Sequence, residues 1–351
     1  MRKLSTLKPP ARVLVKEVNW LGDVVMSLPA LRAVRQAFPR AHLSVLVKKE
    51  LASFFDGALW IDEVIAYGIA RGARGIGDRR RVIRRLRAGT FDLAILLPRS
   101  FSSALWAVLA RVPQRVGFVG DARGMMLTDK TSRPRELFAR HQVYDYLYLL
   151  RQTLGIAGSE SDYKVDAHPP HRQRMRDWLA ARRRRPAGKL IALAVAAAYG
   201  PAKEWPVDRY AALIDLLAEH GAECVLVGAP SERAKCEQVA AASRVGALVA
   251  AGETSIGEAL ALLSLCDGFA GNDSGSMHVA GAIGIPTVGL FGSTNPERTA
   301  PLGPKTKVIY HRMECSPCLA RTCRFGHYDC LHRIAVHEVA QALAELGALG
   351  E

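Results

Sequence analysis

The sequence predicts an α/β protein of two domains, each built on a doubly wound parallel sheet. The chain has 351 residues, too many for one ordinary core and suited to two domains of about 150 to 180 residues each. Strand-like and helix-like segments alternate along most of the sequence, which is typical of parallel strands joined by helical crossovers. Because the alternation starts twice, near residues 12 and 190, we expect two such domains in series.

The first domain is expected at residues 1–170. A β-rich segment, a short turn and an apolar-periodic helix open it, and further strands follow, with helical segments such as 82–86 between the second and the third. The expected strands are 12–18, 43–47, 91–97 and 115–118, and the first helix is 23–38. Residues 171–188 are expected to be a linker, because they follow a Pro-Pro pair and contain an arginine run and a further proline.

The second domain is expected at residues 189–335, where the alternation restarts. The expected strands are 190–196, 223–227, 246–250, 268–270 and 287–291, and the expected helices are 207–220, 231–242, 256–265 and 277–283. A C-terminal helix is expected within residues 336–351, and the sequence does not say which half it packs against.

The charge predicts an anionic partner. Lys and Arg total 48 against 33 Asp and Glu, a net charge of +15, and eight arginines lie between Arg71 and Arg87. Such a field attracts nucleic acid, anionic lipid or a phosphorylated substrate, although arginines on a solvated face are the plainer explanation of any single run. No aromatic residue is interleaved in this run, as stacking on single-stranded nucleic acid would require, so we expect no nucleic-acid partner.

The hydropathy pattern favours a cytoplasmic protein. No stretch reaches the ~18 apolar residues of a membrane span, and residues 1–12 have no apolar signal-peptide core. We expect at most a peripheral contact with the cytoplasmic face of the inner membrane, through the arginine-rich region.

Open parallel sheets bind ligands at the carboxyl ends of their strands, where loops lead into helices. Residues 19–23 (NWLGD) lie at such a place, between the first strand and the first helix. Gly22 permits a close backbone path, and the Asp23 carboxylate either caps the helix or faces a ligand.

Residues 271–278 (GNDSGSMH) occupy the same kind of place late in the chain. Small residues leave amides accessible at a helix start, where the dipole favours a phosphate, and Asp273 can accept hydrogen bonds from sugar hydroxyls. Ordinary turn and capping chemistry is the alternative.

Residues 199–206 (YGPAKEWP) follow the first strand of the second half. Lys203 is placed to reach a pyrophosphate, while Trp205 and Pro206 would fix the loop and start the next helix. The alternative is a surface lysine beside a structural tryptophan.

Four segments together resemble glycosyltransferase family 9, which includes the bacterial ADP-heptose:lipopolysaccharide heptosyltransferases, and in particular its heptosyltransferase II branch. They are NWLGDVVMSLPAL (19–31), LLPRSFSSALWAVLARVPQRVGF (96–118), GPAKEWP (200–206) and GNDSGSMHVAGAIGIPTVGLFGSTNP (271–296). The resemblance extends from residue 12 to about 346. It implies the GT-B architecture, in which two Rossmann-like doubly wound domains face each other across a cleft, the N-terminal one binding the acceptor and the C-terminal one the nucleotide sugar.

The resemblance also implies roles for matching positions. Asp23 matches the family's candidate general base, and Lys203 matches the basic residue that contacts the donor phosphates. The other substrate-binding candidates are Asn19 and Gly22 near the base, Asp273, Ser274, Gly275 and His278 in the donor-binding loop and helix, and Gly228, Glu253 and Thr254 around the nucleotide pocket. Arg99 departs from the Asn that related type II sequences often carry, so we expect altered acceptor contacts there.

The implied reaction is inverting transfer of heptose from ADP-L-glycero-D-manno-heptose to the inner core of lipopolysaccharide. No Asp-x-Asp pair, the commonest signature of a metal-bridged nucleotide-sugar site, occurs in the sequence, so we expect a metal-independent enzyme that requires no cofactor. Another GT-B enzyme, with a different donor or acting as an epimerase, is the alternative. A non-enzymatic basic binding module is a third hypothesis.

Four of the seven cysteines are clustered as Cys315-x2-Cys318-x4-Cys323-x6-Cys330. This spacing suits a structural, tetrahedral zinc site, which would have no part in catalysis. Reduced thiols and redox-formed pairs remain open alternatives, because four cysteines on one loop need not converge.

Overall fold

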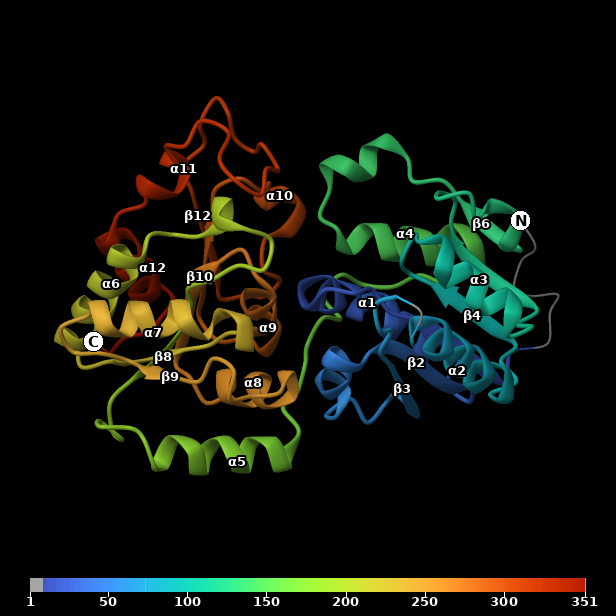
Figure 1. The fold of residues 1–351 in the computed structure, drawn as a ribbon, viewed down its shortest axis with the longest axis horizontal. Helices are drawn as coiled ribbons and strands as arrows, with labels where there is room; N and C mark the ends of the chain where they lie inside the picture. Colours follow the sequence, from blue (N-terminus) through green and yellow to red (C-terminus); the bar gives the residue numbers. More distant parts are fainter. Residues whose placement is uncertain (1–8, 73, 351) are drawn as a thin grey trace. The chain divides into compact units, whose positions relative to one another are not determined.

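The computed structural model describes residues 9–72 and 74–350, and the chain divides into two compact units after Tyr163 (Figure 1). This division lies a few residues before the expected boundary at residue 170. Residues 171–188, expected to be a linker, belong to the second unit. There α5 (Pro169–Ala180) packs against α8 (Ile256–Leu263), which makes this segment part of the domain.

The first unit contains a six-stranded parallel sheet with the strand order β3-β2-β1-β4-β5-β6. Its strands are β1 (Arg12–Lys16), β2 (His42–Lys48), β3 (Glu63–Tyr67), β4 (Leu93–Leu96), β5 (Gln114–Phe118) and β6 (Asp129–Thr131). Its α-helices are α1 (Leu21–Ala37), α2 (Arg74–Ala88), α3 (Phe101–Leu109) and α4 (Val143–Leu154), and its short 3-10 helices are η2 (Lys49–Phe55), η3 (Gly124–Met126) and η4 (Arg135–Ala139).

Helices cover both faces of this sheet, since α1 packs with α4 and α2 packs with α3. The strands are buried on both sides, so β1 and β4 read as nearly continuous apolar runs. On α2 only a narrow stripe, including Val82 and Leu86, is buried, and the arginines of this helix face solvent.

The second unit repeats this plan with the order β12-β11-β10-β7-β8-β9, again with all strands parallel. Its strands are β7 (Leu190–Ala194), β8 (Glu223–Leu226), β9 (Leu248–Val249), β10 (Gly268–Asn272), β11 (Thr287–Phe291) and β12 (Thr306–Tyr310). Its remaining helices are α6 (Val207–Glu219), α7 (Arg233–Ala242), α9 (Gly275–Ile283), α10 (Pro296–Thr299), α11 (Asp329–His332) and α12 (Val336–Glu345), with the 3-10 helices η5 (Pro201–Lys203) and η6 (Pro230–Glu232).

In this second unit α6 contacts α7 and α12, whereas α8 contacts α5 and α9. The C-terminal helix α12 therefore packs on the second unit, where Val339 and Leu343 join the main core cluster. Counted in chain order within each unit, both sheets have the same order, 3-2-1-4-5-6, in which the winding direction reverses between the first and fourth strands. The reversal lies between β1 and β4 in one unit and between β7 and β10 in the other.

The expected fold class, two doubly wound α/β domains, is confirmed. Strand β11 begins and ends at the expected residues, and β1, β2, β5, β7 and β10 differ by a few residues at their ends. The strands β3, β6 and β12 were not expected from the sequence. In the described residues, no helix has the length and apolar character needed to cross a membrane.

Candidate active site

The candidate residues of the first unit lie at the switch point of its sheet. Asn19, Gly22 and Asp23 follow β1, and Arg99 follows β4, the strand paired with β1. Asn19 is exposed and its Oδ1 accepts a hydrogen bond from the Tyr67 hydroxyl at 3.1 Å. Arg99 is also exposed, so its side chain is open to a ligand at this edge.

Asp23 lies in the first turn of α1 but is not its capping residue, because the N-cap position is Trp20. The Asp23 Oδ1 instead accepts a hydrogen bond from Gln142 Nε2 at 2.8 Å, and the same Nε2 donates to the Tyr146 hydroxyl at 2.9 Å. Burial, and then the negative charge of Asp23, raise the pKa of Tyr146 well above its usual value. The carboxylate is thus oriented by α4, which the sequence did not indicate.

Two buried charged residues lie at the end of β1, where Lys16 is the last residue of the strand and Glu17 follows it. Burial raises the pKa of Glu17 to about 7, although the Val18 amide and the Ser27 hydroxyl both donate to its carboxylate. Burial likewise lowers the pKa of Lys16 to about 7. Each group is therefore easily neutralised near neutral pH, and the negative charge of Asp23 contributes to the raised pKa of Glu17.

The candidate residues of the second unit lie at the switch point of the other sheet, because Lys203 follows β7 and Asp273 follows β10. Lys203 Nζ forms an ion pair with Asp273 Oδ2 at 2.5 Å, and Thr294 Oγ1 donates to the same oxygen at 2.7 Å. The two charged side chains are only 14% and 4% exposed. His278 Nε2 lies 3.9 Å from the other carboxylate oxygen. The structure therefore brings three of the predicted residues into one polar cluster.

Residues 199–206, named here the lysine loop, are held in place by a buried anchor. Trp205 is fully buried, stacks edge-on with Tyr210, and donates from its indole N–H to the Ile334 carbonyl at 3.2 Å. Its backbone N–H donates to Asn272 Oδ1 at 2.9 Å. As expected, the tryptophan fixes the loop, and α6 begins directly after Pro206.

Polar groups without protein partners surround the start of α9. Within residues 9–72 and 74–350, the buried atoms with no hydrogen-bond partner include Ser274 Oγ and Asn272 Nδ2. Ser274 is the N-cap residue but its side chain makes no capping bond, and Gly275 opens the helix. The first amides of a helix point outward without intrahelical partners, so this helix start offers donors to an anion.

Strand β10 approaches its neighbour at this point too closely for a side chain. A Cβ at Gly271 would lie 2.8 Å from the Ala194 carbonyl oxygen and 2.9 Å from the Ala194 Cβ. Glycine here lets β7 and β10, and hence Lys203 and Asp273, come together.

Glu253, Thr254 and Gly228 do not belong to the polar cluster of Lys203 and Asp273. The Glu253 carboxylate accepts from Trp178 Nε1 at 2.9 Å and from Arg233 Nη1 at 3.1 Å, and these bonds, the tryptophan's first, lower its pKa. Thr254 lies between β9 and α8, just before the Ser255 cap. Gly228 follows β8 and its carbonyl accepts from the Gly252 amide. These residues lie at the same sheet edge but are occupied with local contacts.

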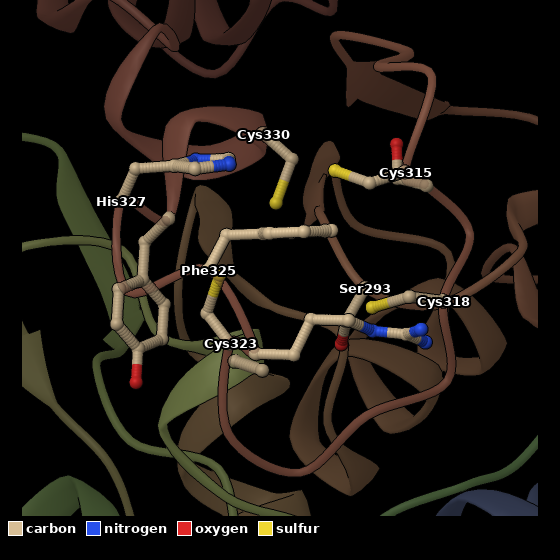
Figure 2. Close-up of a pocket in the computed structure, with 11 residues that line it drawn as sticks. Ser293, Cys315, Cys318, Cys323, Phe325, His327 and Cys330 are labelled. Carbon is tan, nitrogen blue, oxygen red and sulfur yellow. The ribbon is translucent and has the colours of Figure 1, made fainter.

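The four clustered cysteines line one small cavity, together with Ser293 and Phe325 (Figure 2). They belong to residues 311–330, named here the cysteine loop, which runs from the end of β12 into α11. Amide N–H groups, that of Tyr328 first, lower the pKa of Cys323. Burial, and then the three neighbouring cysteines, raise the pKa of Cys330 to about 11.

One family of known proteins matches this sequence over most of its length. The profile of Glycosyltransferase family 9 (heptosyltransferase) matches residues 79–329, well over half of the chain. Lipopolysaccharide heptosyltransferase 2 of Salmonella typhimurium is 30% identical over 318 residues, which are 86% of this chain and 90% of that protein. The enzyme of the same name from Escherichia coli K12 gives the same identity and coverage.

Solved structures agree with these sequence matches. The structure of E. coli ADP-heptose lipopolysaccharide heptosyltransferase II has a TM-score of 0.82 at 27% identity, covering 95% of this chain and 98% of that one. A glycosyltransferase family 9 protein of Veillonella parvula has a TM-score of 0.86 at 25% identity, covering 96% and 97%. The chain belongs to glycosyltransferase family 9.

The family and the GT-B fold class expected from the sequence are thereby confirmed, and the protein is a glycosyltransferase. The cleft between domains and the roles of single residues stay predictions. Nothing in the sequence marked Gln142 or Tyr146, and Asn272 lay in the quoted segment 271–278 without an assigned role. Thr294 was inside a quoted motif, but nothing local marked it as a partner of Asp273.

Proposed function

We propose that this enzyme transfers heptose from ADP-L-glycero-D-manno-heptose to the inner core of lipopolysaccharide, with inversion at the anomeric carbon, as a heptosyltransferase of type II. The observation that carries this proposal is the similarity to enzymes named lipopolysaccharide heptosyltransferase 2 over most of their length. The two switch-point sites provide the chemistry that such a transfer needs.

The donor diphosphate is proposed to bind at the start of α9. Its negative charge suits the free amides of the first turn and the positive end of the helix dipole. Ser274 Oγ and Asn272 Nδ2, which lack partners among the described side chains and backbone groups, would gain an acceptor. Lys203 adds a cation at the same place and stabilises the charge that develops on the leaving ADP.

Asp23 is proposed to act as general base. The acceptor hydroxyl oxygen attacks the anomeric carbon, its proton passes to the Asp23 carboxylate, and the bond to the diphosphate oxygen breaks with its electrons going to ADP. Gln142 orients the carboxylate by donating to its Oδ1 at 2.8 Å. We expect no metal to be required for this step, so added Mg²⁺ should leave the rate unchanged.

The enzyme is proposed to work at the cytoplasmic face of the inner membrane, on an acceptor that carries acidic groups. All eight arginines between Arg71 and Arg87 are exposed. Among the described residues, only two of these eight arginines form ion pairs, Arg81 with Asp78 and Arg85 with Glu63. The others are available to phosphates or acidic sugars. Reversing four of these charges should weaken binding to anionic vesicles and raise the KM for the acceptor, and unchanged values would remove this part of the proposal.

A transfer assay with ADP-heptose and a heptosylated core acceptor tests the proposal. Asp23→Ala should lower kcat by at least about 100-fold, the usual contribution of a general base, while ADP binding measured by calorimetry stays the same. Asp208→Ala is the matched control, because Asp208 is also an acid in the first turn of a helix, and it is exposed. Product formed from the donor without an acceptor would instead indicate an epimerase.

A further inference from the structure

We propose that Cys315, Cys318, Cys323 and Cys330 bind one tetrahedral zinc ion, which fastens the cysteine loop against the lysine loop. The site itself does not depend on the proposed reaction. The consequence for ligand binding does, because it rests on the assignment of Lys203 to the donor site.

The four clustered cysteines meet at one cavity. The four thiols come from 16 consecutive residues, yet all four side chains line the same cavity, as Figure 2 shows. The cavity has about 20 Å³ of room for a water-sized sphere, which is enough for a single ion. Cys224, Cys236 and Cys266 are buried elsewhere in the core, so the four cysteines at this cavity form a separate group.

Polar groups around the cavity suit bound thiolates. The amide N–H groups of residues 325–328 are directed at the Cys323 sulfur, and Gly326, at φ +76°, closes a turn by donating to the Cys323 carbonyl at 3.2 Å. Successive amides of this kind favour a negative atom. Ser293 Oγ also lines the cavity, is buried, and has no hydrogen-bond partner among the described residues. A metal-bound sulfur would supply that partner.

The charge around the cavity also suits a zinc–thiolate centre. Zinc with four thiolates carries a net charge of −2, which needs nearby cations or donors. Arg324 lines the cavity, and Arg321 lies on the same loop between the second and third cysteines. This basic setting compensates a dianionic centre.

The side chains must move for the ion to bind. In the part of the chain that the structure describes, no three His, Cys, Asp or Glu side chains are already grouped as metal ligands. Zinc–sulfur bonds of about 2.3 Å place the sulfurs of a tetrahedron about 3.8 Å apart, so the thiols must rotate inward around the cavity. Each thiol loses its proton to solvent as its sulfur binds, which gives four protons per zinc.

The cysteine loop is irregular and buries little apolar surface, although hydrogen bonds such as that from the Leu319 amide to the Ser293 carbonyl tie it to the second unit. Between β12 and α11 it forms no helix or strand, and Leu319 and Phe325 are more than 60% exposed. With so little apolar burial, a cross-link is an effective way to order such a segment.

The loop in turn supports the lysine loop. The Tyr199 hydroxyl donates to the Leu319 carbonyl at 2.6 Å, and the Ala202 amide donates to the Arg321 carbonyl at 3.0 Å. Lys203 Nζ lies 4.9 Å from the centre of the Tyr199 ring. An ordered cysteine loop therefore holds Lys203 where it meets Asp273.

Metal analysis of the full-length protein, purified under reducing conditions without chelator, tests the proposal. We expect one zinc per chain in the wild type and about a tenth of that or less in Cys323→Ser. Cys266→Ser is the matched control, because the Cys266 thiol donates to the Leu262 carbonyl, which a hydroxyl can also do, and it should keep its zinc. Cobalt added to the zinc-free wild type should give the visible absorption of a tetrahedral thiolate site. ADP affinity should fall about tenfold on zinc removal.

The proposal would be overturned if the wild-type protein held no stoichiometric metal and also gained no cobalt spectrum. It would also be overturned if Cys266→Ser lost as much metal as Cys323→Ser, or if mass spectrometry found disulfides among the four cysteines. Iron in place of zinc would keep the thiolate site and contradict the identity of the ion. Unchanged ADP affinity after zinc removal would contradict the support of the lysine loop alone. Failure of heptose transfer would contradict the proposed function and leave the zinc content unaffected, so the two failures are distinguishable.

Discussion

Replacement of Lys203 by methionine should destabilise the second unit strongly. The Asp273 carboxylate is 4% exposed and has Lys203 as its ion-pair partner, with Thr294 donating one hydrogen bond. Removing one partner of a buried pair costs about 3–5 kcal/mol, because the other charge stays buried without compensation. The Thr294 bond places the expected loss near the lower limit, at about 3 kcal/mol. For a unit of this size each kcal/mol corresponds to about 2–4 °C, so its melting temperature should fall by about 6–12 °C.

Calorimetric melting of four proteins tests this reasoning. Asp273→Asn added to the Lys203→Met variant removes the unpaired charge and keeps an acceptor for Thr294, so most of the lost stability should return. Lys235→Met is the control, because Lys235 pairs with Glu204 at 30% and 16% exposure and such pairs contribute about 1 kcal/mol or less. A Lys203→Met protein that melts with the wild type, or a double variant no better than the single one, would refute the argument.

Three further predictions concern Glu17, Gln142 and Gly200. Burial raises the pKa of Glu17 from 4.5 to about 7, so ionisation of this carboxyl lowers the free energy of unfolding as the pH rises between these values. In urea unfolding, the free energy of unfolding of Glu17→Gln should equal that of the wild type near pH 4.5 and exceed it by about 3 kcal/mol at pH 8. A difference that does not depend on pH would be evidence against this. Gln142→Leu should lower kcat about tenfold in steady-state transfer kinetics, because Asp23 loses the hydrogen bond that orients it, and the KM for the nucleotide sugar should not change. A change in KM alone would contradict the positioning role of Gln142. Gly200→Ala should lower the free energy of unfolding by about 1–3 kcal/mol and weaken ADP binding. The reason is that φ of Gly200 is +143° and a Cβ there would lie 2.6 Å from the Arg321 carbonyl oxygen. Unchanged ADP affinity by calorimetry would show that the contact between the lysine loop and the cysteine loop is dispensable.

Much of the fold could be predicted because the central strands are short apolar runs that are followed by turns and, in most cases, by a helix. Strand β11, fully buried, is the clearest example and was placed at its observed residues. The edge strands β6 and β12 were missed because partial burial leaves them a mixed pattern, and β6 has only three residues. Residues 171–188 were expected to be a linker, because the packing of α5 against α8 is a tertiary contact without a local signal.

The site was predictable where its residues follow a strand directly. Asp23, Lys203 and Asp273 each lie just beyond a central strand, and parallel pairing brings the last two together. Gln142 was not predictable, because it reaches Asp23 across 119 positions of sequence. Nor does the sequence reveal that the Glu253 side chain is already occupied by Trp178 and Arg233.

The central claim is that Asp23 takes the acceptor proton while the second unit holds the donor diphosphate. Single-turnover transfer from ADP-heptose to a heptosylated core acceptor, with the enzyme saturated by donor, measures this most directly. The account predicts that Asp23→Ala slows the transfer step by at least about 100-fold with ADP affinity unchanged, and that Asp208→Ala transfers at the wild-type rate. Wild-type transfer by Asp23→Ala, or a loss caused wholly by weaker ADP binding, would contradict it.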